Sequence, residues 1–245
     1  MDKLVGFKRY YNLTMLFNGF SKKGIEFLKK LDKNNSKVWF ENHRHIWEKT
    51  ILAPNKAFIE DMGETLQILV PTIKAKPKVS GSLFKIYRDV RFSKDKTAKK
   101  DKIGLMFWQG LGHRMQSSSF YMHYTKDTYF VAAGIRSFKS PLLKTYRNYI
   151  KHEKHRESLH LILEDLKNKG YNYSTQKYKR VPKDFTGDES HLYLTKLDSL
   201  FSYIEYDLDD IFFTVELLDK LFKIYDDMKE LQNWVYEMTL THKEK

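Results

Sequence analysis

The sequence contains no cysteine among its 245 residues. This absence excludes disulfide bonds, cysteine nucleophiles and thiolate metal sites, and it fits the reducing cytoplasm, where we expect the protein to reside. Apolar runs of about 18 residues are also missing, so we expect no membrane span. The N-terminus MDKLVGFKRYYNLTMLF has no apolar segment of signal-peptide length.

The chain also lacks the short motifs of several enzyme classes. No P-loop, G-x-S-x-G or H-E-x-x-H sequence occurs. Gly110 and Gly112 do not open a G-x-G-x-x-G motif, which argues against a dinucleotide site and leaves any cofactor unidentified. We expect no metal site, because carboxylates at recognised metal-binding spacing do not accompany His43, His45, His152, His155 and His160.

What the chain has in excess is positive charge, with a net charge of +13 at neutral pH. Residues 74–102 hold eleven Lys and Arg against three Asp, a net of +8, whereas residues 198–230 hold ten acidic residues against three Lys, a net of −7. A basic segment favours anionic partners such as nucleic acid or phosphorylated metabolites. If the two segments face each other, the charges are instead satisfied inside the molecule.

Helical periodicity dominates the first third of the chain. Apolar stripes predict helices over residues 20–35 and 36–52, with Ser21 and either Asn35 or Ser36 as N-caps. A third helix is predicted over residues 55–70, after Pro54.

The middle of the chain changes to a period of two residues. Residues 82–92 read as a strand that places Phe84, Ile86 and Arg88 on one side. IGLMFWQG, residues 103–110, reads as a second strand. FYMHY-TKDT-YFVAAGI, residues 120–135, reads as a hairpin with a polar turn.

The last part of the chain returns to helices, predicted over residues 140–152, 157–170, 191–203 and 214–238. Ser140 is the expected cap of the first of these, and Asp207 to Asp210 read as capping aspartates. The order of helices, sheet and helices predicts an α+β fold. We expect a single domain over residues 1–245, with a central antiparallel sheet of four or five strands in 82–136, flanked by helical segments 20–70 and 140–240.

One stretch, KIYRDVRFSKDKTAK (residues 85–99), resembles the signature R-x-x-R-D-x-R-F-x-x-x-K-x-P-Y of the mostly bacterial domain-of-unknown-function family 2461. The similarity extends to segments 27–54, 132–150 and 178–185, and so covers at least residues 20–203. The resemblance implies a fold and supplies no catalytic residues. The chain departs from the signature at three positions, namely Lys85 for arginine, Ala98 for proline and Lys99 for tyrosine.

The motif predicts a binding site for an anion, either a phosphorylated small molecule or nucleic acid. Asp89 lies between two arginines that lower its pKa, so it is better suited to orienting them than to acting as a general base. Interleaved aromatic residues, among them Phe92, Trp108 and Tyr121, give the segment the character of a base-stacking surface, although packing in the core explains them more simply. The predicted binding residues are Arg88, Asp89, Arg91, Lys94, Lys96 and His113.

Two alternatives stay open at this point. The protein is an enzyme acting on a phosphate- or carboxylate-bearing substrate, with cations stabilising the transition state and His113 or Asp89 assisting. Otherwise it is a non-catalytic interaction module in which the motif fixes strand register, and the lysine run Lys94 to Lys102 is a solvated turn. His123, on a predicted strand, is expected to be packed. The sequence fixes neither the ligand nor the oligomeric state.

Overall fold

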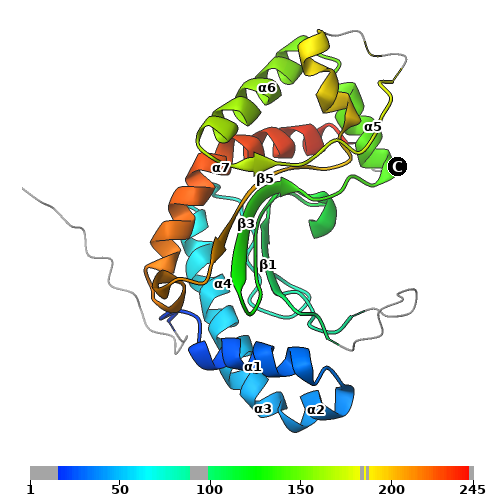
Figure 1. Ribbon diagram of the computed structural model, residues 1–245. Coiled ribbons are helices and arrows are strands. Elements are labelled where there is room, and N and C mark those ends of the chain that lie inside the picture. Colours follow the sequence, from blue (N-terminus) through cyan, green and yellow to red (C-terminus); the bar gives the residue numbers. More distant parts are fainter. Residues whose placement is uncertain (1–15, 89–98, 183–184, 186–187, 243–245) are drawn as a thin grey trace, which may run out of the picture.

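A computed structural model of the chain describes residues 16–88, 99–182, 185 and 188–242. In these residues a curved antiparallel sheet lies between helices from both ends of the chain, which confirms the α+β class (Figure 1). The N-terminal elements are α1 (Lys22–Lys33), α2 (Lys37–Asn42), α3 (Arg44–Trp47), the π-helical turn η1 (Glu48–Leu52) and α4 (Ala53–Leu66). The later elements are β1 (Ile103–Trp108), η2 (Arg114–Gln116), β2 (Ser119–Tyr124), β3 (Thr128–Ile135), α5 (Ser140–Tyr149), α6 (Glu153–Asn168), β4 (Asn172–Tyr173), η3 (Glu189–Lys196), β5 (Leu200–Asp207), η4 (Asp210–Phe213) and α7 (Leu217–Leu240).

The sheet has the strand order β1-β2-β3-β5-β4, and each neighbouring pair is antiparallel. β1 and the β2–β3 hairpin lie where the sequence predicts them. Side chains alternate between the two faces along each strand. We call the side that carries Phe107, Phe120, Met122 and Val131 the core face. The opposite side is the open face, and its side chains include Met106, Tyr121, His123, Phe130 and Ala132.

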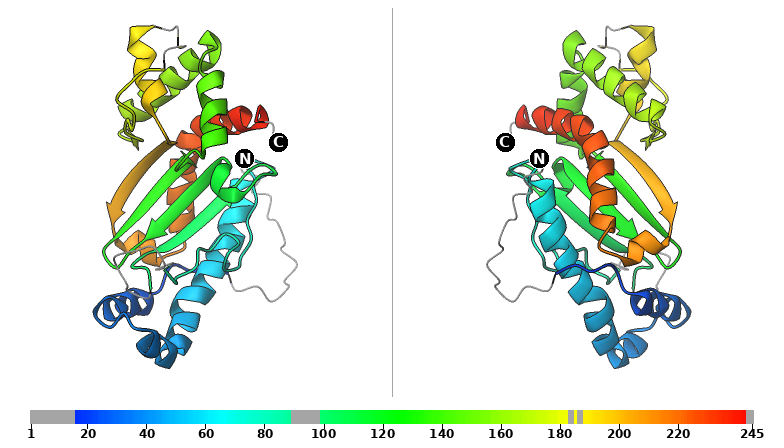
Figure 2. Two further views of the ribbon diagram at one scale, coloured as in Figure 1. Left: turned by 90° about the vertical axis from the view of Figure 1, so that its right-hand side faces the viewer. Right: turned by 90° about the vertical axis from the view of Figure 1, so that its left-hand side faces the viewer.

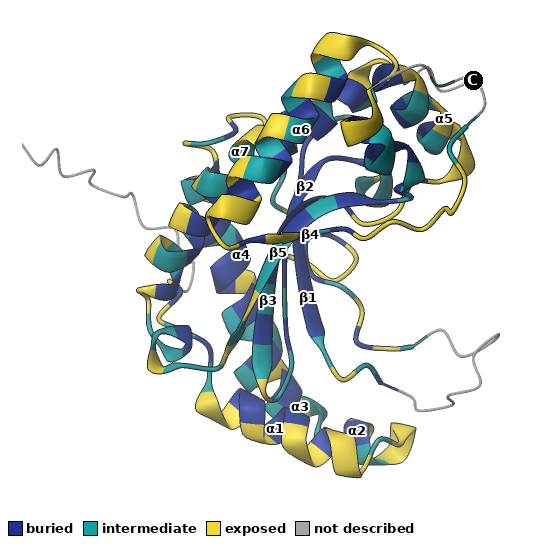
Figure 3. Cartoon of the chain, turned by 45° about the horizontal axis from the view of Figure 1, so that its top comes forward, coloured by how far each residue is buried: buried dark blue, intermediate teal, exposed yellow. Residues whose placement is uncertain are grey.

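Helices α4 and α7 cover the core face, and the second panel of Figure 2 shows them crossing in front of the strands. Phe58 of α4 packs edge-on against Phe107, with ring centroids 6.3 Å apart. Tyr225 of α7 packs on Phe120 at 4.8 Å. The apolar residues of this interface are buried, and α1 and α6 show both buried and exposed residues, as amphipathic helices do (Figure 3).

Side-chain caps fix the first helices as the sequence predicts. Ser21 accepts a hydrogen bond from the Gly24 amide (3.3 Å), and Ser36 accepts one from the Trp39 amide (3.2 Å). The single helix expected over residues 36–52 is interrupted, because α2 ends at Asn42 and the following helix contains the π-helical turn η1. Pro54, directly after this turn, has no amide hydrogen to donate, which favours such a local widening.

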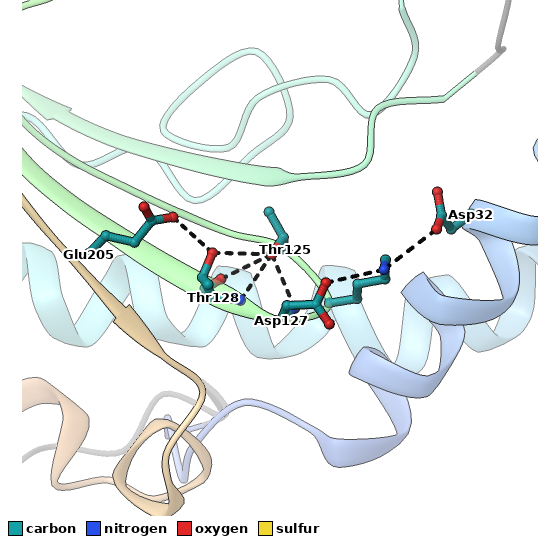
Figure 4. Close-up of polar contacts among 6 residues, drawn as sticks. Asp32, Thr125, Asp127, Thr128 and Glu205 are labelled. Carbon is teal, nitrogen blue, oxygen red and sulfur yellow. Dashed lines mark hydrogen bonds and ion pairs between the residues drawn. The ribbon is translucent and has the colours of Figure 1, made fainter.

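The β2–β3 turn is fixed to elements on both sides of it (Figure 4). The Thr125 hydroxyl accepts hydrogen bonds from the amides of Asp127 (3.1 Å) and Thr128 (3.0 Å). The ammonium of Lys126 lies 3.7 Å from the Asp32 carboxylate of α1. Thr128 in turn donates its hydroxyl hydrogen to Glu205 of β5 at 2.9 Å. These contacts hold the lower end of the sheet against α1.

The sheet is not confined to residues 82–136, as was predicted, because β4 and β5 belong to it. A helix was predicted over 191–203, but Glu189–Lys196 forms a 3-10 helix and Leu200–Asp207 forms β5, between β3 and β4 in the sheet. Short apolar runs do not distinguish a helix from a strand. Pairing along all eight residues of β5 with β3 decides the outcome, because it satisfies backbone groups that a lone helix of this length holds weakly.

The prediction of a regular strand over residues 82–92 is also wrong for the part that the structure describes. Its described part forms isolated bridges, Leu83 with Leu105 and Tyr87 with Lys99, rather than a ladder. Leu83 and Ile86 are buried and Tyr87 is exposed. Residues 89–92 lie outside the described residues. The segment therefore runs beside β1 without extending the sheet.

The C-terminal helices begin and end largely as expected. Pro141 lies in the first turn of α5, but the N-cap is Lys139 rather than Ser140. Gly170, just after α6, has a φ of +88°, a conformation that favours glycine. Asp209 caps η4 by accepting a hydrogen bond from the Phe212 amide (3.0 Å), so its carboxylate serves the backbone. Within the described residues, every helix is too short or too polar to span a bilayer.

Candidate anion-binding site

The motif of residues 85–99 is described only at its two ends. Asp89, Arg91, Lys94 and Lys96 lie outside the described residues, so their roles stay predictions. Arg88 is described, and its Nε donates a hydrogen bond to the Lys99 carbonyl at 3.1 Å. Its guanidinium also lies 3.7 Å from the Asp101 carboxylate. Arg88 thus fastens the start of the motif to the chain that returns from it.

The end of the motif is held by Asn35, which lies in the segment 27–54 that resembles the family. Its side-chain amide donates to the Lys99 carbonyl (3.0 Å), and its side-chain oxygen accepts from the Lys99 amide (2.8 Å). The Lys99 side chain is fully buried, with Nζ 3.1 Å from the centre of the Tyr87 ring and 4.2 Å from that of Phe40. Burial lowers the pKa of Lys99. This lysine is a buried cation held by aromatic rings, in the position where the signature has tyrosine.

A pocket of about 350 Å³ opens on the open face of the sheet, on the side away from α7. Its volume lies in the range of small-ligand sites, roughly 300–1,000 Å³. Strands β1, β2, β3 and β5, the segment before β1, and η2 with its flanking residues all contribute to it. The lining includes Phe84, Met106, Met115, Tyr121, His123, Phe130, Ala132 and Phe201.

Cationic side chains surround this pocket. Lys100, Lys102 and Arg136 line it, and the lining contains no carboxylate among the described residues. The Arg114 guanidinium lies 4.5 Å from the centre of the Phe84 ring, which is itself part of the lining. Burial lowers the pKa of Lys100, and the nearby charges of Lys102, Arg114 and Arg88 lower it further. The motif's Arg88 therefore belongs to the same cluster of positive charge.

His123 lies within this positive environment. Its ring stacks on Phe130, with centroids 4.9 Å apart. Burial lowers the pKa of His123 to about 4, and the charges of Lys102 and Arg136 act in the same direction, so the ring is neutral at neutral pH. The buried Nδ1 atom has no hydrogen-bond partner among the described residues.

Tyr121 stays protonated, because burial raises its pKa to about 12. Among the described carboxylates, that of Asp101 partly offsets the effect of Lys102 and Arg136 on the pKa of His123. The Asp101 carboxylate faces Arg88, and Glu205 of β5 is turned to the hairpin, where it accepts the hydrogen bond from Thr128 (Figure 4). Among the described residues, no cluster of three histidine or acidic side chains is arranged to hold a metal ion. The polar chemistry of the site is thus cations, neutral His123 and the Tyr121 hydroxyl.

His113 lies apart from this pocket. It precedes η2, where its Nδ1 accepts a hydrogen bond from the Met115 amide at 3.3 Å, and its side chain is exposed. The residue that reaches the site from this loop is its neighbour Arg114, whose Nη1 atom is buried without a hydrogen-bond partner among the described residues. His113 therefore shapes the turn that carries Arg114.

Four residues of the pocket lining were not among the predicted binding residues, namely Tyr121, His123, Phe130 and Arg136, although Tyr121 was noted as an interleaved aromatic residue. The hairpin does contain a signal for them, because aromatic residues occur at both alternating sets of positions, Phe120 and Tyr124 on one face and Tyr121 on the other. One face of such a hairpin is covered by helices, and the aromatic residues of the other face need a separate explanation.

Comparison with known protein families gives one match, to the family described as "Conserved hypothetical protein (DUF2461)", over residues 23–234 of the chain. The match includes the described residues that line the pocket. A search of curated proteins found no match.

Proposed function

Since the chain belongs to the DUF2461 family, whose description specifies no activity, we propose a function from the site itself, namely the binding of an anionic ligand in the open-face pocket. The observation that supports it is the lining, in which Lys100, Lys102 and Arg136 are accompanied by no described carboxylate. Partly desolvated cations of like sign repel one another, and an anion that enters relieves that repulsion and gains charge-assisted hydrogen bonds.

Neutralisation by the acidic C-terminal segment is the competing explanation of the basic charge. The described ion pairs of that segment are made elsewhere, by Asp209 with Lys220, Asp210 with Lys22, Asp226 with Lys229 and Asp227 with Lys169. Helix α7 also packs on the core face, whereas the pocket is on the open face. These placements favour an external anion as the partner of the cluster.

The pocket also lies close to the motif that the sequence singles out, since Arg88 influences Lys100 directly. We therefore keep Arg91 and Lys96 as proposed contributors. Arg91→Ala is expected to abolish binding with little loss of thermal stability. For the cysteine-free chain we propose a cytoplasmic, bacterial setting, in which phosphorylated metabolites and nucleic acid are abundant anions.

Calorimetric titration of the purified protein with inorganic phosphate, a sugar phosphate and a short single-stranded oligonucleotide, each at low and high salt, tests the proposal. The double variant Lys100→Ala/Lys102→Ala is expected to weaken binding by at least about 100-fold, because charged hydrogen bonds contribute roughly 1.5–3 kcal/mol each. Lys223→Ala, which removes a charge on α7, is the matched control and is expected to bind normally. Absence of binding by the unaltered protein at low salt would contradict the proposal.

A second candidate is an enzyme that uses the same anion site to act on a phosphate- or carboxylate-bearing substrate. The specific observation is His123 in the lining of the pocket, since an imidazole that is neutral at neutral pH can accept a proton from a substrate. Turnover of phosphate esters that is lost in His123→Gln, with binding retained, would support the enzyme. Binding without turnover would leave the simpler binding protein.

A further inference from the structure

Five aromatic side chains on or beside the open face lie outside the hydrophobic core. They are Phe84, Tyr121, Phe130, Phe201 and Tyr203, and all are only partly buried. Contiguous aromatic surface left open to solvent commonly marks a recognition site. These rings therefore suit a ligand that has an apolar or aromatic part in addition to the anionic group that the cations attract.

The rings are ordered with respect to one another. His123 and Phe130 stack at 4.9 Å with an interplanar angle of 21°, and Phe130 and Tyr203 stack at 5.0 Å with an angle of 22°. Phe84 packs edge-on against Tyr121 at 6.0 Å. Phe130 is stacked from both sides, by His123 of β2 and Tyr203 of β5, so it presents its ring edge to a ligand in the pocket.

Small residues alternate with these rings. Gly104 is opposite His123 in the register, and Ala132 is opposite Tyr121. A Cβ atom at position 104 would lie 3.1 Å from the Tyr121 hydroxyl and 3.2 Å from the Phe84 ring, so a side chain there would crowd both rings. The small residues thus leave space between the aromatic side chains, and the pocket occupies it.

Polar groups distinguish the kind of ring that fits. The Tyr121 hydroxyl and the His123 imidazole both belong to the lining of the pocket. An acyl chain or a plain hydrocarbon ring would leave both groups unpaired, at a cost in free energy. A heteroaromatic ring with hydrogen-bonding edges can pair with them and still pack on Phe84 and Phe130.

We propose that the ligand is a single nucleotide unit, with its base among the open-face rings and its phosphate on Lys100, Lys102 and Arg136. This inference rests on the proposed anion-binding function and adds the identity of the group attached to the anion. A pocket of about 350 Å³ admits one such unit. A base pair within a duplex cannot present a ring face to the pocket, so the unit is either a free nucleotide or an unpaired nucleotide of a single strand.

Calorimetric titration with adenosine and cytidine 5′-monophosphate, ribose 5-phosphate and inorganic phosphate separates the base from the phosphate. The nucleotides are expected to bind about 5- to 100-fold more tightly than ribose 5-phosphate, the equivalent of roughly 1–3 kcal/mol for base stacking. A four-nucleotide single strand distinguishes the two sources. Tighter binding of the strand assigns the site to nucleic acid, and equal binding assigns it to free nucleotides.

Variants that exchange a ring for an aliphatic group make the test specific. Phe84→Leu and Phe130→Leu are expected to reduce the advantage of nucleotide over ribose 5-phosphate at least about 5-fold, while the affinity for ribose 5-phosphate is unchanged. Phe213→Leu, a partly buried ring of η4 near α1, is the matched control. Thermal denaturation of each variant shows that the fold is retained.

These measurements distinguish a failure of the nucleotide inference from a failure of the proposed anion-binding function. If ribose 5-phosphate binds as tightly as the nucleotides, the nucleotide inference is wrong and anion binding stands. If none of the phosphates binds at low salt, both are wrong. If the nucleotides bind more tightly but Phe84→Leu and Phe130→Leu keep the full advantage, the base is recognised elsewhere and this site assignment is wrong.

Discussion

The two faces of the sheet contain similar kinds of residue and have different surroundings. On the core face, Phe120 is covered by α7, and the Tyr124 hydroxyl accepts a hydrogen bond from Asn55 of α4 at 2.7 Å. On the open face, no described helix covers Tyr121 and Phe130, and the Nδ1 of His123 has no hydrogen-bond partner in the described part of the chain. Aromatic content alone therefore does not identify a core. What distinguishes the open face is its group of cations, Lys100, Lys102 and Arg136, which no described carboxylate of the pocket lining accompanies.

The largest expected difference between the faces is in stability. Phe120→Ala empties a fully buried position against Tyr225 and is expected to lower the free energy of unfolding by about 3–5 kcal/mol. Phe130→Ala removes a partly solvated ring outside the core and is expected to cost about 1 kcal/mol. Urea denaturation of both variants measures the difference. Equal losses would show that the open face is part of the core.

The second prediction concerns pH. The pKa of His123 is about 4 in the folded protein and near 6.5 when unfolded, so the unfolded chain binds more protons between these values. Stability is therefore expected to fall as the pH drops from 6.5 towards 4. The contribution is about 1–2 kcal/mol once solvent screening of the partly exposed ring is allowed for. His123→Phe keeps the stacking and should flatten this part of the stability profile. If His123→Phe leaves the dependence of stability on pH unchanged, the His123 ring is exposed to solvent in the folded protein.

The smallest expected change in stability tests whether the positive charges of the open face repel one another. Lys100→Met removes a cation that is close to Lys102, Arg114 and Arg88, and it is expected to raise the stability of the ligand-free protein by less than about 1 kcal/mol. The same variant should weaken phosphate binding. Thermal denaturation with and without phosphate measures both. A loss of stability in the ligand-free variant would mean that Lys100 has an internal partner and that the site is structural.

Much of the fold follows from local patterns in the sequence. The period of two residues in β1 and the hairpin, and the capping residues Ser21 and Gly170, predict elements that the structure contains. β5 was missed because its apolar spacing also fits a helix, and only its long-range pairing with β3 decides between them. The stretch 82–88 was taken for a regular strand because alternation does not show whether a neighbour pairs continuously.

The site was predictable in part. The lysine run contains Lys100 and Lys102, which line the pocket, and the motif contains Arg88, whose charge acts on Lys100. Sequence proximity could not show that Lys99 is buried between Phe40 and Tyr87 while Lys100 lines a pocket. The sequence also does not show that Arg114, His123 and Arg136 lie near one another. They belong to η2, to β2 and to the segment after β3, which become neighbours only in the folded protein.

The most direct test of the open-face site is nuclear magnetic resonance of the histidine side chains during titration with inorganic phosphate. We expect a saturable change in the His123 resonances during the titration. The pKa of His123 should also rise above about 4, because a bound anion offsets the charges of Lys102 and Arg136. His160, on α6, should be unaffected. Saturable phosphate binding without any change in the His123 resonances would show that phosphate does not bind in the open-face pocket.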